Sequence, residues 1–343
     1  MKKLLNTLYV TLPSAYLVLD GENVVIMEGE EKRLRVPLHN LEQIVTFGYA
    51  GASPALMGAC AKRGVSITFL TMHGRFLARV LGDEHGNVLM RKEQYRRSDS
   101  EEQSGGIARN ILIGKLHNSR WVLERTARDY PLRVDAKRLQ EASQSIAQDI
   151  ERLRETSNLD SLRGIEGEAA AKYFSVFNEM ILQNKDEFWF NDRNRRPPRD
   201  NVNALLSFVY TLLANDMASA LTTVGLDSYV GFLHRDRSGR RSLALDLSEE
   251  LRAPVADRFV LSMINMRKIN GSDFLQKENG AVLMGDDTRK AVLTAWQKRK
   301  QEELTHPYLK EKITWGLVPH AQALLFARMM RNDLEAYPPF LWK

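Results

Sequence analysis

The chain contains a single cysteine among its 343 residues, Cys60, and can therefore form no intramolecular disulfide. Disulfide-dependent proteins are typical of oxidising compartments, whereas a lone thiol is typical of a reducing one. We therefore expect a cytoplasmic protein. Because Cys60 lies among Met57, Gly58, Ala59 and Ala61, we interpret it as a small core residue and not as a nucleophile.

Several other features are absent. No run of 18 or more apolar residues is present, which argues against a membrane span, and polar residues follow Met1 too early for a signal peptide. The sequence has no GxSxG nucleophile elbow, no P-loop and no Rossmann glycine pattern, which disfavours three common enzyme classes. The formal net charge of +6 favours polyanionic partners, although weakly.

The pattern of apolar residues divides the chain into two parts. Residues 1–95 contain short apolar runs between turn residues and one helix, Pro54 to Arg63, so they predict a small β-rich domain. Residues 96–106 are polar and are expected to form a linker. Residues 107–343 carry apolar side chains at helical spacing. We therefore predict an α+β fold, with a small N-terminal β-domain followed by a larger all-α domain.

Two short segments of the β-rich part predict a hairpin. The runs Tyr16–Leu19 and Val24–Met27 flank the residues Asp20 to Asn23. Asp-Gly between two apolar runs is a hairpin signal, although we expect the loop here to be longer than two residues. Ser53 is the expected N-cap of the helix in this part.

Glu166 is the first candidate site residue. It lies in the segment Arg163–Gly167, which we expect in the first turn of a helix that runs to about Leu182. An acid in this position can simply favour the helix dipole, and Glu168 could do the same. The glycines on either side favour a functional site, because a glycine inside a helix costs about 1 kcal/mol relative to alanine. Such a cost is understandable where another backbone or a nucleic acid approaches closely.

His234 is the second candidate. It ends the apolar run Tyr229–Leu233 and precedes a basic loop, Arg235 to Arg241, that contains a Ser-Gly turn. A lone histidine in such a position is more often a hydrogen-bonded structural residue than a metal ligand. If the loop folds back on itself, however, His234 and Asp246 lie close together although they are twelve positions apart.

Asp246 and Glu249 have two compatible interpretations. Asp-x-x-Glu is the pattern of a capping box, in which Asp246 would begin a helix and Glu249 would reach back to it. Residues three apart also share a helix face, so both carboxylates can point towards His234. Glu250 points elsewhere and is the weaker candidate. Asp246 can cap the helix while Glu249 binds a metal.

Glu166, His234 and Glu249 together would supply a mixed set of oxygen and nitrogen donors. Such a set suits Mg²⁺ or Mn²⁺, with water or phosphate in the remaining positions. Because the sequence offers no evident protein nucleophile, a metal-assisted phosphodiester reaction is the natural reaction class.

Two arginine-rich loops are candidates for DNA phosphate contact. The first follows Phe188, Trp189 and Phe190, and arginine beside aromatic residues suits phosphate contact and base stacking. The aromatic residues could equally pack beneath a surface loop. The candidate DNA-binding residues are Arg193, Arg195, Arg196, Arg199, Arg235, Arg237, Arg240 and Arg241.

Taken in order, these motifs resemble the CRISPR-associated integrase family, the first and most widespread of the spacer-acquisition proteins. The resemblance covers nearly the whole chain. It rests on Arg163–Gly167, Tyr173–Phe174, Arg195–Pro198, Asp200–Tyr210, Gly225–Asp227, Gly231–His234 and Asp246–Arg252. The C-terminal segment Tyr337–Trp342 is similar to the type I-C branch.

The resemblance implies that Glu166, His234 and Glu249 bind the metal and that Asp246 is a supporting acid. It implies a homodimer formed through the β-domains and a small second CRISPR-associated subunit as partner. The family joins the 3′-hydroxyl ends of a short DNA fragment to the repeat at the leader end of a CRISPR array, and many members also cut DNA. Some relatives carry aspartate in place of Glu249, and both side chains are oxygen ligands.

We therefore expect a Mg²⁺- or Mn²⁺-dependent DNA integrase and endonuclease of CRISPR adaptation, with Glu166, His234, Glu249 and Asp246 as catalytic residues. One alternative is a metal-dependent nuclease that acts mainly on branched or single-stranded DNA and uses the same residues. The other is a non-catalytic DNA-binding scaffold, whose DNA binding would not depend on a metal.

Overall fold

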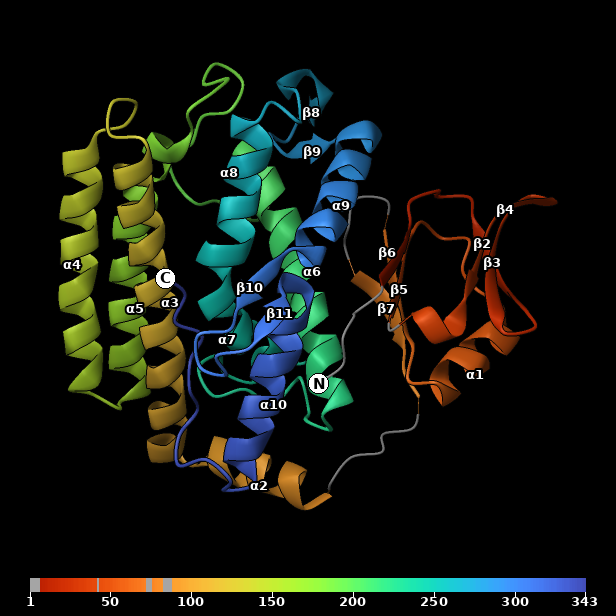
Figure 1. Cartoon of the computed structure of the whole chain (residues 1–343), viewed down its shortest axis with the longest axis horizontal. Coiled ribbons are helices and arrows are strands. Elements are labelled where there is room, and N and C mark those ends of the chain that lie inside the picture. Colours follow the sequence, from red (N-terminus) through yellow and green to blue (C-terminus); the bar gives the residue numbers. More distant parts are fainter. Residues whose placement is uncertain (1–6, 42, 72–75, 83–87) are drawn as a thin grey trace. The chain divides into compact units, whose positions relative to one another are not determined.

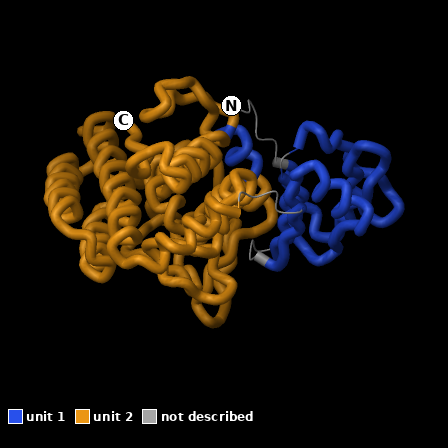
Figure 2. The backbone as a smooth tube through the Cα atoms, turned by 90° about the horizontal axis from the view of Figure 1, so that it is seen from below, with its two compact units in different colours: residues 1–85, 293–300 blue, residues 86–292, 301–343 orange. Residues whose placement is uncertain are grey.

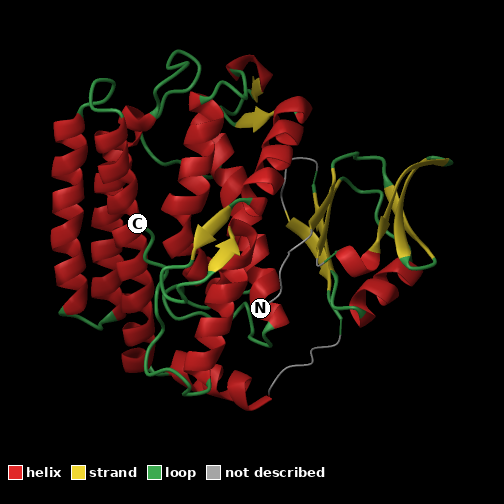
Figure 3. Cartoon of the chain, in the orientation of Figure 1, coloured by secondary structure: helices red, strands yellow, loops and turns green. Residues whose placement is uncertain are grey.

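The structure is a computed structural model that describes residues 7–41, 43–71, 76–82 and 88–343. Two compact units divide the chain, one of residues 1–85 with 293–300 and the other of residues 86–292 with 301–343 (Figure 2). Strands dominate the first unit and helices the second (Figure 3). The predicted α+β fold, with β-structure first and helices after it, is confirmed.

The first unit holds two small sheets and a helix. A four-stranded sheet has the order β1-β5-β6-β7, in which β7 is antiparallel to its neighbour. A three-stranded antiparallel sheet has the order β2-β3-β4. The elements are β1 Thr7–Val10, β2 Tyr16–Asp20, β3 Asn23–Glu28, β4 Glu31–Pro37, β5 Gln43–Phe47, α1 Pro54–Lys62, β6 Ser66–Leu70 and β7 Phe76–Val80.

The local signals in this unit act as the sequence predicts, with one exception. The hairpin forms between β2 and β3, and the Ser53 side chain caps α1 by accepting a hydrogen bond from the Leu56 backbone N–H. The hairpin loop is shorter than expected, because Asp20 and Asn23 still pair across the strands. Gly21 has a φ of +58°, which a two-residue hairpin turn requires and glycine adopts without strain.

The second unit is built from long helices. Three of them, α3, α4 and α5, lie side by side (Figure 1). Helix α6 is largely buried, and the segment between α7 and α8 is π-helical. The helices that lie wholly or partly in this unit are α2 Val88–Asp99, α3 Glu101–Asp129, α4 Ala136–Arg154, α5 Leu159–Ser175, α6 Asn201–Thr223, α7 Ser242–Leu251, the π-helical Arg252–Asp257, α8 Arg258–Asn265, α9 Asp286–Gln301 and α10 Val318–Met330.

Two predictions about this unit are wrong in detail. Residues 96–106 were expected to form a linker, but they belong to α2 and α3, and the Ser100 side chain caps α3. Polar side chains suggested a linker there, yet Ser104 and Gly105 are buried in the first turn of α3. The unit is also not purely α-helical, because it contains two short hairpins. These are β8 Phe274–Gln276 with β9 Val282–Met284, and β10 Glu303–Thr305 with β11 Lys312–Thr314.

Helix α6 is long and apolar enough to pass a composition test for a membrane span, and it is the single helix in the described residues that does so. In its most apolar window, however, 67% of the helix is buried inside the protein. Helix α6 begins at the Asp200 cap and packs against α7 and α10. Its apolar composition therefore matches its place within the packed helices.

The C-terminal segment 337–342 packs onto the helix that carries two of the candidate site acids. Glu250 of α7 accepts hydrogen bonds from the Tyr337 hydroxyl, from Gln322 Nε2 at 2.8 Å and from the Phe340 backbone N–H at 2.9 Å. The Asn118 side chain of α3 bonds the backbone of Phe340 and Trp342. Glu250 thus faces away from the other candidate acids, as predicted, and anchors α7 to the chain end.

Candidate active site

Asp246 is the centre of the turn that presents His234. Its carboxylate is fully buried and accepts four hydrogen bonds. Oδ2 accepts from the backbone N–H of Phe232 at 2.7 Å and of Leu233 at 3.0 Å. Oδ1 accepts from the backbone N–H of His234 at 3.0 Å and lies 2.6 Å from His234 Nδ1. The predicted proximity of His234 and Asp246 is therefore confirmed.

The capping-box interpretation of Asp246 is wrong. Helix α7 begins at Ser242, four residues earlier, so Asp246 lies inside the helix. The backbone N–H groups of Leu243 and Ala244 donate to the Ser228 carbonyl at 3.1 and 3.3 Å, which satisfies the start of the helix without a side-chain cap. Asp246 is consequently free to hold the turn before the basic loop.

Gly231 allows the turn and α7 to approach closely. A Cβ atom on Gly231 would lie 2.7 Å from Ser242 Cβ and 2.8 Å from Asp246 Oδ2. Both distances are too short for real contacts, so any side chain at this position would push the turn away from Asp246. The glycine in Gly231–His234 is thus needed for the hydrogen bonds that orient the histidine.

Glu249 lies one helical turn after Asp246 and is 3% exposed. Its Oε1 is 2.8 Å from Arg252 Nη1 and 4.0 Å from His234 Nε2, and its Oε2 is 2.7 Å from Lys115 Nζ. Burial alone would raise the pKa of Glu249, but the charges of Arg252, Lys115 and His234 outweigh burial and bring the pKa down to about 2. The carboxylate is therefore ionised at neutral pH.

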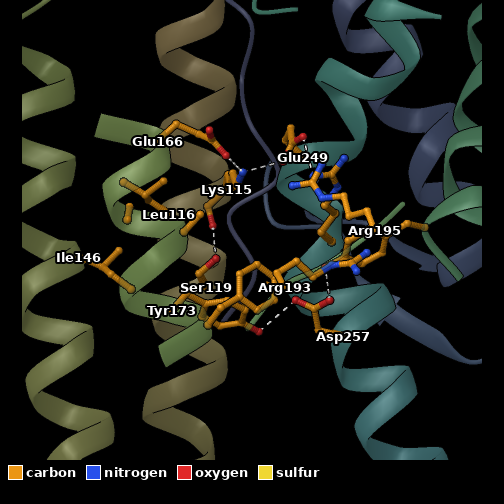
Figure 4. Close-up of a pocket in the computed structure, with 16 residues that line it drawn as sticks. Lys115, Leu116, Ser119, Ile146, Glu166, Tyr173, Arg193, Arg195, Glu249 and Asp257 are labelled. Carbon is orange, nitrogen blue, oxygen red and sulfur yellow. Dashed lines mark hydrogen bonds and ion pairs between the residues drawn. The ribbon is translucent and has the colours of Figure 1, made fainter. Parts of the chain in front are cut away.

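Glu166 completes the group from a second helix, α5 Leu159–Ser175. It lies in the middle of α5, which begins at Leu159, so the prediction that it occupies the first helical turn is wrong. Its Oε1 forms an ion pair with Lys115 Nζ (Figure 4). Among the described residues, no atom lies within 4 Å of a Cβ built on Gly164 or Gly167. The glycines therefore leave this face of α5 open and do not accommodate a neighbouring backbone.

Glu166, His234 and Glu249 converge on one place, but they are not yet at ligand distances. In the part of the chain that the structure describes, no three histidine, cysteine or acidic side chains are gathered closely enough to hold a metal ion. The Lys115 ammonium lies between the two glutamates, in the position that a metal cation would take. The donors themselves fit Mg²⁺ or Mn²⁺, because they are two carboxylates and one imidazole with Nε2 directed to Glu249.

An arginine-lined pocket opens beside this group. Three of the eight predicted DNA-binding arginines line it, together with Arg163 and Arg252, which the sequence did not single out. Arg163 donates two hydrogen bonds to the Leu233 carbonyl, at 3.0 and 2.8 Å, and so fixes the turn before His234. The pocket is lined by Asp160, Arg163, Glu166, Arg195, Leu233, His234, Arg235, Arg240, Glu249 and Arg252.

The other five arginines do not line this pocket. Arg193 is half-buried, donates to Asn203 Oδ1 at 2.6 Å and to Ser207 Oγ at 3.2 Å, and lies over the Tyr210 ring. Arg241 donates to Asn215 Oδ1 at 2.9 Å. These contacts favour a structural role for both residues. The remaining side chains are exposed, and they are Arg196, Arg199 and Arg237.

The aromatic residues before the first arginine-rich loop were expected either to stack on DNA bases or to pack beneath the loop, and the structure divides them between these two roles. Phe188 and Phe190 are buried, and Phe190 packs against Phe174 and Phe177. Trp189 is 47% exposed, so it alone of the three is available for stacking. Most of this aromatic cluster therefore supports the loop from beneath.

A second pocket adjoins the acids, and Arg193 and Arg195 are among the residues that line it. Two tyrosine hydroxyls, those of Tyr173 and Tyr210, donate to Asp257 at 3.0 and 2.6 Å. Burial raises the pKa of Asp257 to about 6, although both hydroxyls and the Arg193 and Arg252 charges lower it. The same pocket is lined by Lys115, Glu166 and Glu249, which Figure 4 shows together with Asp257.

Lys115 and Arg252 were missed at first, yet each has a sequence signal. Arg252 follows Glu249 by three residues and therefore shares its helix face. Lys115 occupies a stripe of α3 whose neighbours Ile111 and Leu116 are fully buried. A lysine in such a stripe needs a buried partner, and this requirement points to an acid elsewhere in the chain.

Comparison with known proteins identifies the family. Residues 8–298 match a family model described as "CRISPR associated protein Cas1". A protein of Chlorobaculum tepidum named CRISPR-associated endonuclease Cas1 1 is 50% identical over 343 residues, which is 100% of both chains. These matches place the chain among the CRISPR-associated proteins. It belongs to the Cas1 family.

Solved structures share the fold. One described as "Casposase bound to integration product" superposes with a TM-score of 0.83 and 23% identity, and covers 100% of this chain and 95% of that one. Another, described as "Cas6-RT-Cas1--Cas2 complex", gives a TM-score of 0.82 and 22% identity over 99% of this chain and 36% of that one. At this level of identity the likeness establishes the fold.

Proposed function

We propose that this chain is a metal-dependent DNA integrase and endonuclease of CRISPR adaptation. The observation that carries the proposal is the convergence of Glu166, His234 and Glu249 from three separate parts of the fold beside an arginine-lined pocket. A relative that is 50% identical over its whole length is named an endonuclease, which supports the same reaction class.

The three side chains would hold one Mg²⁺ or Mn²⁺ ion. Bound there, the ion would polarise a phosphate oxygen and offset the charge that develops on the phosphate. His234 can offer its Nε2 lone pair, because its Nδ1–H donates to Asp246 Oδ1 at 2.6 Å and fixes the ring. Asp246 is on this view a positioning residue, and Glu249 enters the reaction already ionised.

The reaction needs no side-chain nucleophile. The 3′-hydroxyl oxygen of the incoming DNA attacks a phosphate of the repeat and forms a new P–O bond, and the bond from that phosphate to the neighbouring 3′-oxygen breaks. The attacking hydroxyl loses its proton, and the released 3′-oxygen takes one up, so the step is balanced. Arg195, Arg235 and Arg240 line the pocket and would hold the DNA backbone. The open face of α5 at Gly164 and Gly167 leaves room for that backbone.

The assembly follows as part of the proposal. We infer a homodimer formed through the β-rich unit and a small second CRISPR-associated subunit as partner, in a cytoplasmic setting that suits the single buried Cys60. A structure of the same fold is described as containing Cas2, which supports this choice of partner. The assignment to the type I-C branch stays a prediction from residues 337–342.

Strand joining tests the proposal. The protein and its partner subunit would be mixed with a labelled short duplex, a plasmid that carries a CRISPR array, and Mn²⁺ or Mg²⁺. We expect label in the plasmid with the wild type and with Glu168→Ala, an exposed acid on the same helix, and none with Glu166→Ala or with chelator. Metal-dependent nicking without label transfer would indicate a nuclease, and DNA binding alone would indicate a scaffold.

A further inference from the structure

Among the residues that the structure describes, Lys115 is the one lysine that contacts two of the proposed metal ligands. Its ammonium pairs with Glu166 of α5 and, at 2.7 Å, with Glu249 of α7, while its own backbone belongs to α3 (Figure 4). The side chain is 12% exposed, and that of Glu249 is 4% exposed. A single charged group therefore ties three helices together, and it lines the second pocket beside both acids.

Three of the four carboxylate oxygens of Glu166 and Glu249 face a cationic side chain. Glu249 Oε2 faces Lys115 and Glu249 Oε1 faces Arg252 at 2.8 Å. Lys115 also takes Glu166 Oε1. An ammonium and a divalent ion seek the same lone pairs, because both are cations bound by carboxylate oxygens. A metal ion that binds Glu166 Oε1 and Glu249 Oε2 together takes the place of this ammonium.

We propose that Lys115 is a built-in cation that holds Glu166 and Glu249 together in the metal-free protein and gives up both carboxylates when the metal binds. The inference rests on the proposed metal site and specifies how that site is filled. It gives each of the two acids, which come from different helices, a cationic partner, and an unpaired buried carboxylate is strongly destabilising. It also makes metal affinity lower than the three ligands alone would give.

Mn²⁺ binding measures this competition without any DNA or reaction. Free Mn²⁺ is followed by electron paramagnetic resonance during titration of the full-length protein. We expect Lys115→Met to bind Mn²⁺ at least about tenfold more tightly than the wild type, which corresponds to about 1.4 kcal/mol. Lys115→Arg keeps the charge and should remain close to the wild type. Lys172→Met is the matched control, because Lys172 pairs with Asp149 at 2.6 Å away from the site.

A second measurement uses the wild-type protein, so it does not depend on whether a variant folds. An amine-acylating reagent is applied with and without Mn²⁺, and modified lysines are quantified by mass spectrometry. We expect Lys115 to react several-fold faster with Mn²⁺ present, because its ammonium loses both partners, whereas Lys172 reacts at an unchanged rate.

The outcomes separate the two proposals. Equal or weaker Mn²⁺ binding by Lys115→Met, or Lys115 labelling that does not respond to Mn²⁺, would overturn the competition while leaving the metal site intact. Mn²⁺ binding that is the same in Glu166→Ala as in the wild type would overturn the metal site and the competition with it. Tighter binding by Lys115→Met that is lost again in the Glu166→Ala, Lys115→Met double variant would support both.

Discussion

Replacing Asp246 by asparagine is the sharpest test of how the site is held. The carboxylate accepts four hydrogen bonds, two on each oxygen, and all four donors belong to the turn that carries His234. Asparagine keeps one oxygen and replaces the other by an NH₂ group. In either orientation, two of the four N–H donors then face another donor inside the protein.

The structure gives the size of the effect. Each buried donor left without an acceptor costs about 1–3 kcal/mol, so two of them cost about 4 kcal/mol. For a unit of about this size, 1 kcal/mol corresponds to about 2–4 °C in melting temperature, which predicts a fall of roughly 10 °C. Loss of the carboxylate behind His234 should also weaken Mn²⁺ binding by about 10–100-fold, as for other partners of metal-binding histidines.

Calorimetry of metal-free protein and Mn²⁺ titration provide the two measurements. Asp236→Asn is the control, since Asp236 is exposed in the basic loop and its substitution changes the charge by the same amount. An Asp246→Asn variant that melts within 2 °C of Asp236→Asn would refute the hydrogen-bond argument. Unchanged Mn²⁺ affinity in a folded variant would refute the role assigned to the His234 ring.

Three further predictions follow from the same unit. Burial lowers the pKa of His306 from 6.5 to about 4. As the pH falls from 6.5 to 4, the unfolded chain therefore gains a proton that the folded chain does not, and about 3 kcal/mol of stability is lost. His306→Gln should remove this part of the pH dependence of stability measured by urea denaturation. Phe340→Ala should lower the free energy of unfolding, measured by urea denaturation, by about 3–5 kcal/mol, because the ring is fully buried. Leu132→Ala, at a 98% exposed position, should change it by less than about 0.5 kcal/mol. In DNA-binding titrations at several salt concentrations, Arg235→Gln should reduce by about 1 the slope of log binding constant against log salt concentration. Arg193→Gln should instead lower the melting temperature. Equal slopes for the wild type and Arg235→Gln would contradict the placement of Arg235 at the DNA.

The sequence predicts those features that depend on neighbouring residues. The β2–β3 hairpin follows from apolar runs around Asp20 and Gly21, and the start of α1 follows from Ser53. The closeness of His234 and Asp246 follows from a loop that returns on itself. In each case the interacting groups lie within about a dozen positions of one another, so the pattern itself contains both partners.

The features that the sequence did not reveal depend on distant partners. Asp-x-x-Glu fits a helix start as well as a helix interior, and the Ser228 carbonyl decides between them by accepting the first N–H groups of α7. Arg193 turns inward because Asn203 and Ser207 of α6 accept its hydrogen bonds. Both partners come from elements whose position is set by packing, which a local pattern does not contain.

The charges of the site show why a cation is needed beside Glu166 and Glu249 whether or not a metal is bound. They also show why Lys115 could not be inferred from the segments that contain the proposed metal ligands. Burial of Glu249 raises its pKa. The pKa nevertheless falls to about 2, because Arg252 and Lys115 both lie within 3 Å of its oxygens. Arg252 comes from the same helical stretch as Glu249, whereas Lys115 comes from α3 and is shared with Glu166. A shared cation keeps the two acids together, so its removal must be accompanied by the arrival of another cation. The same charges therefore determine both the metal affinity and the folding stability of this site.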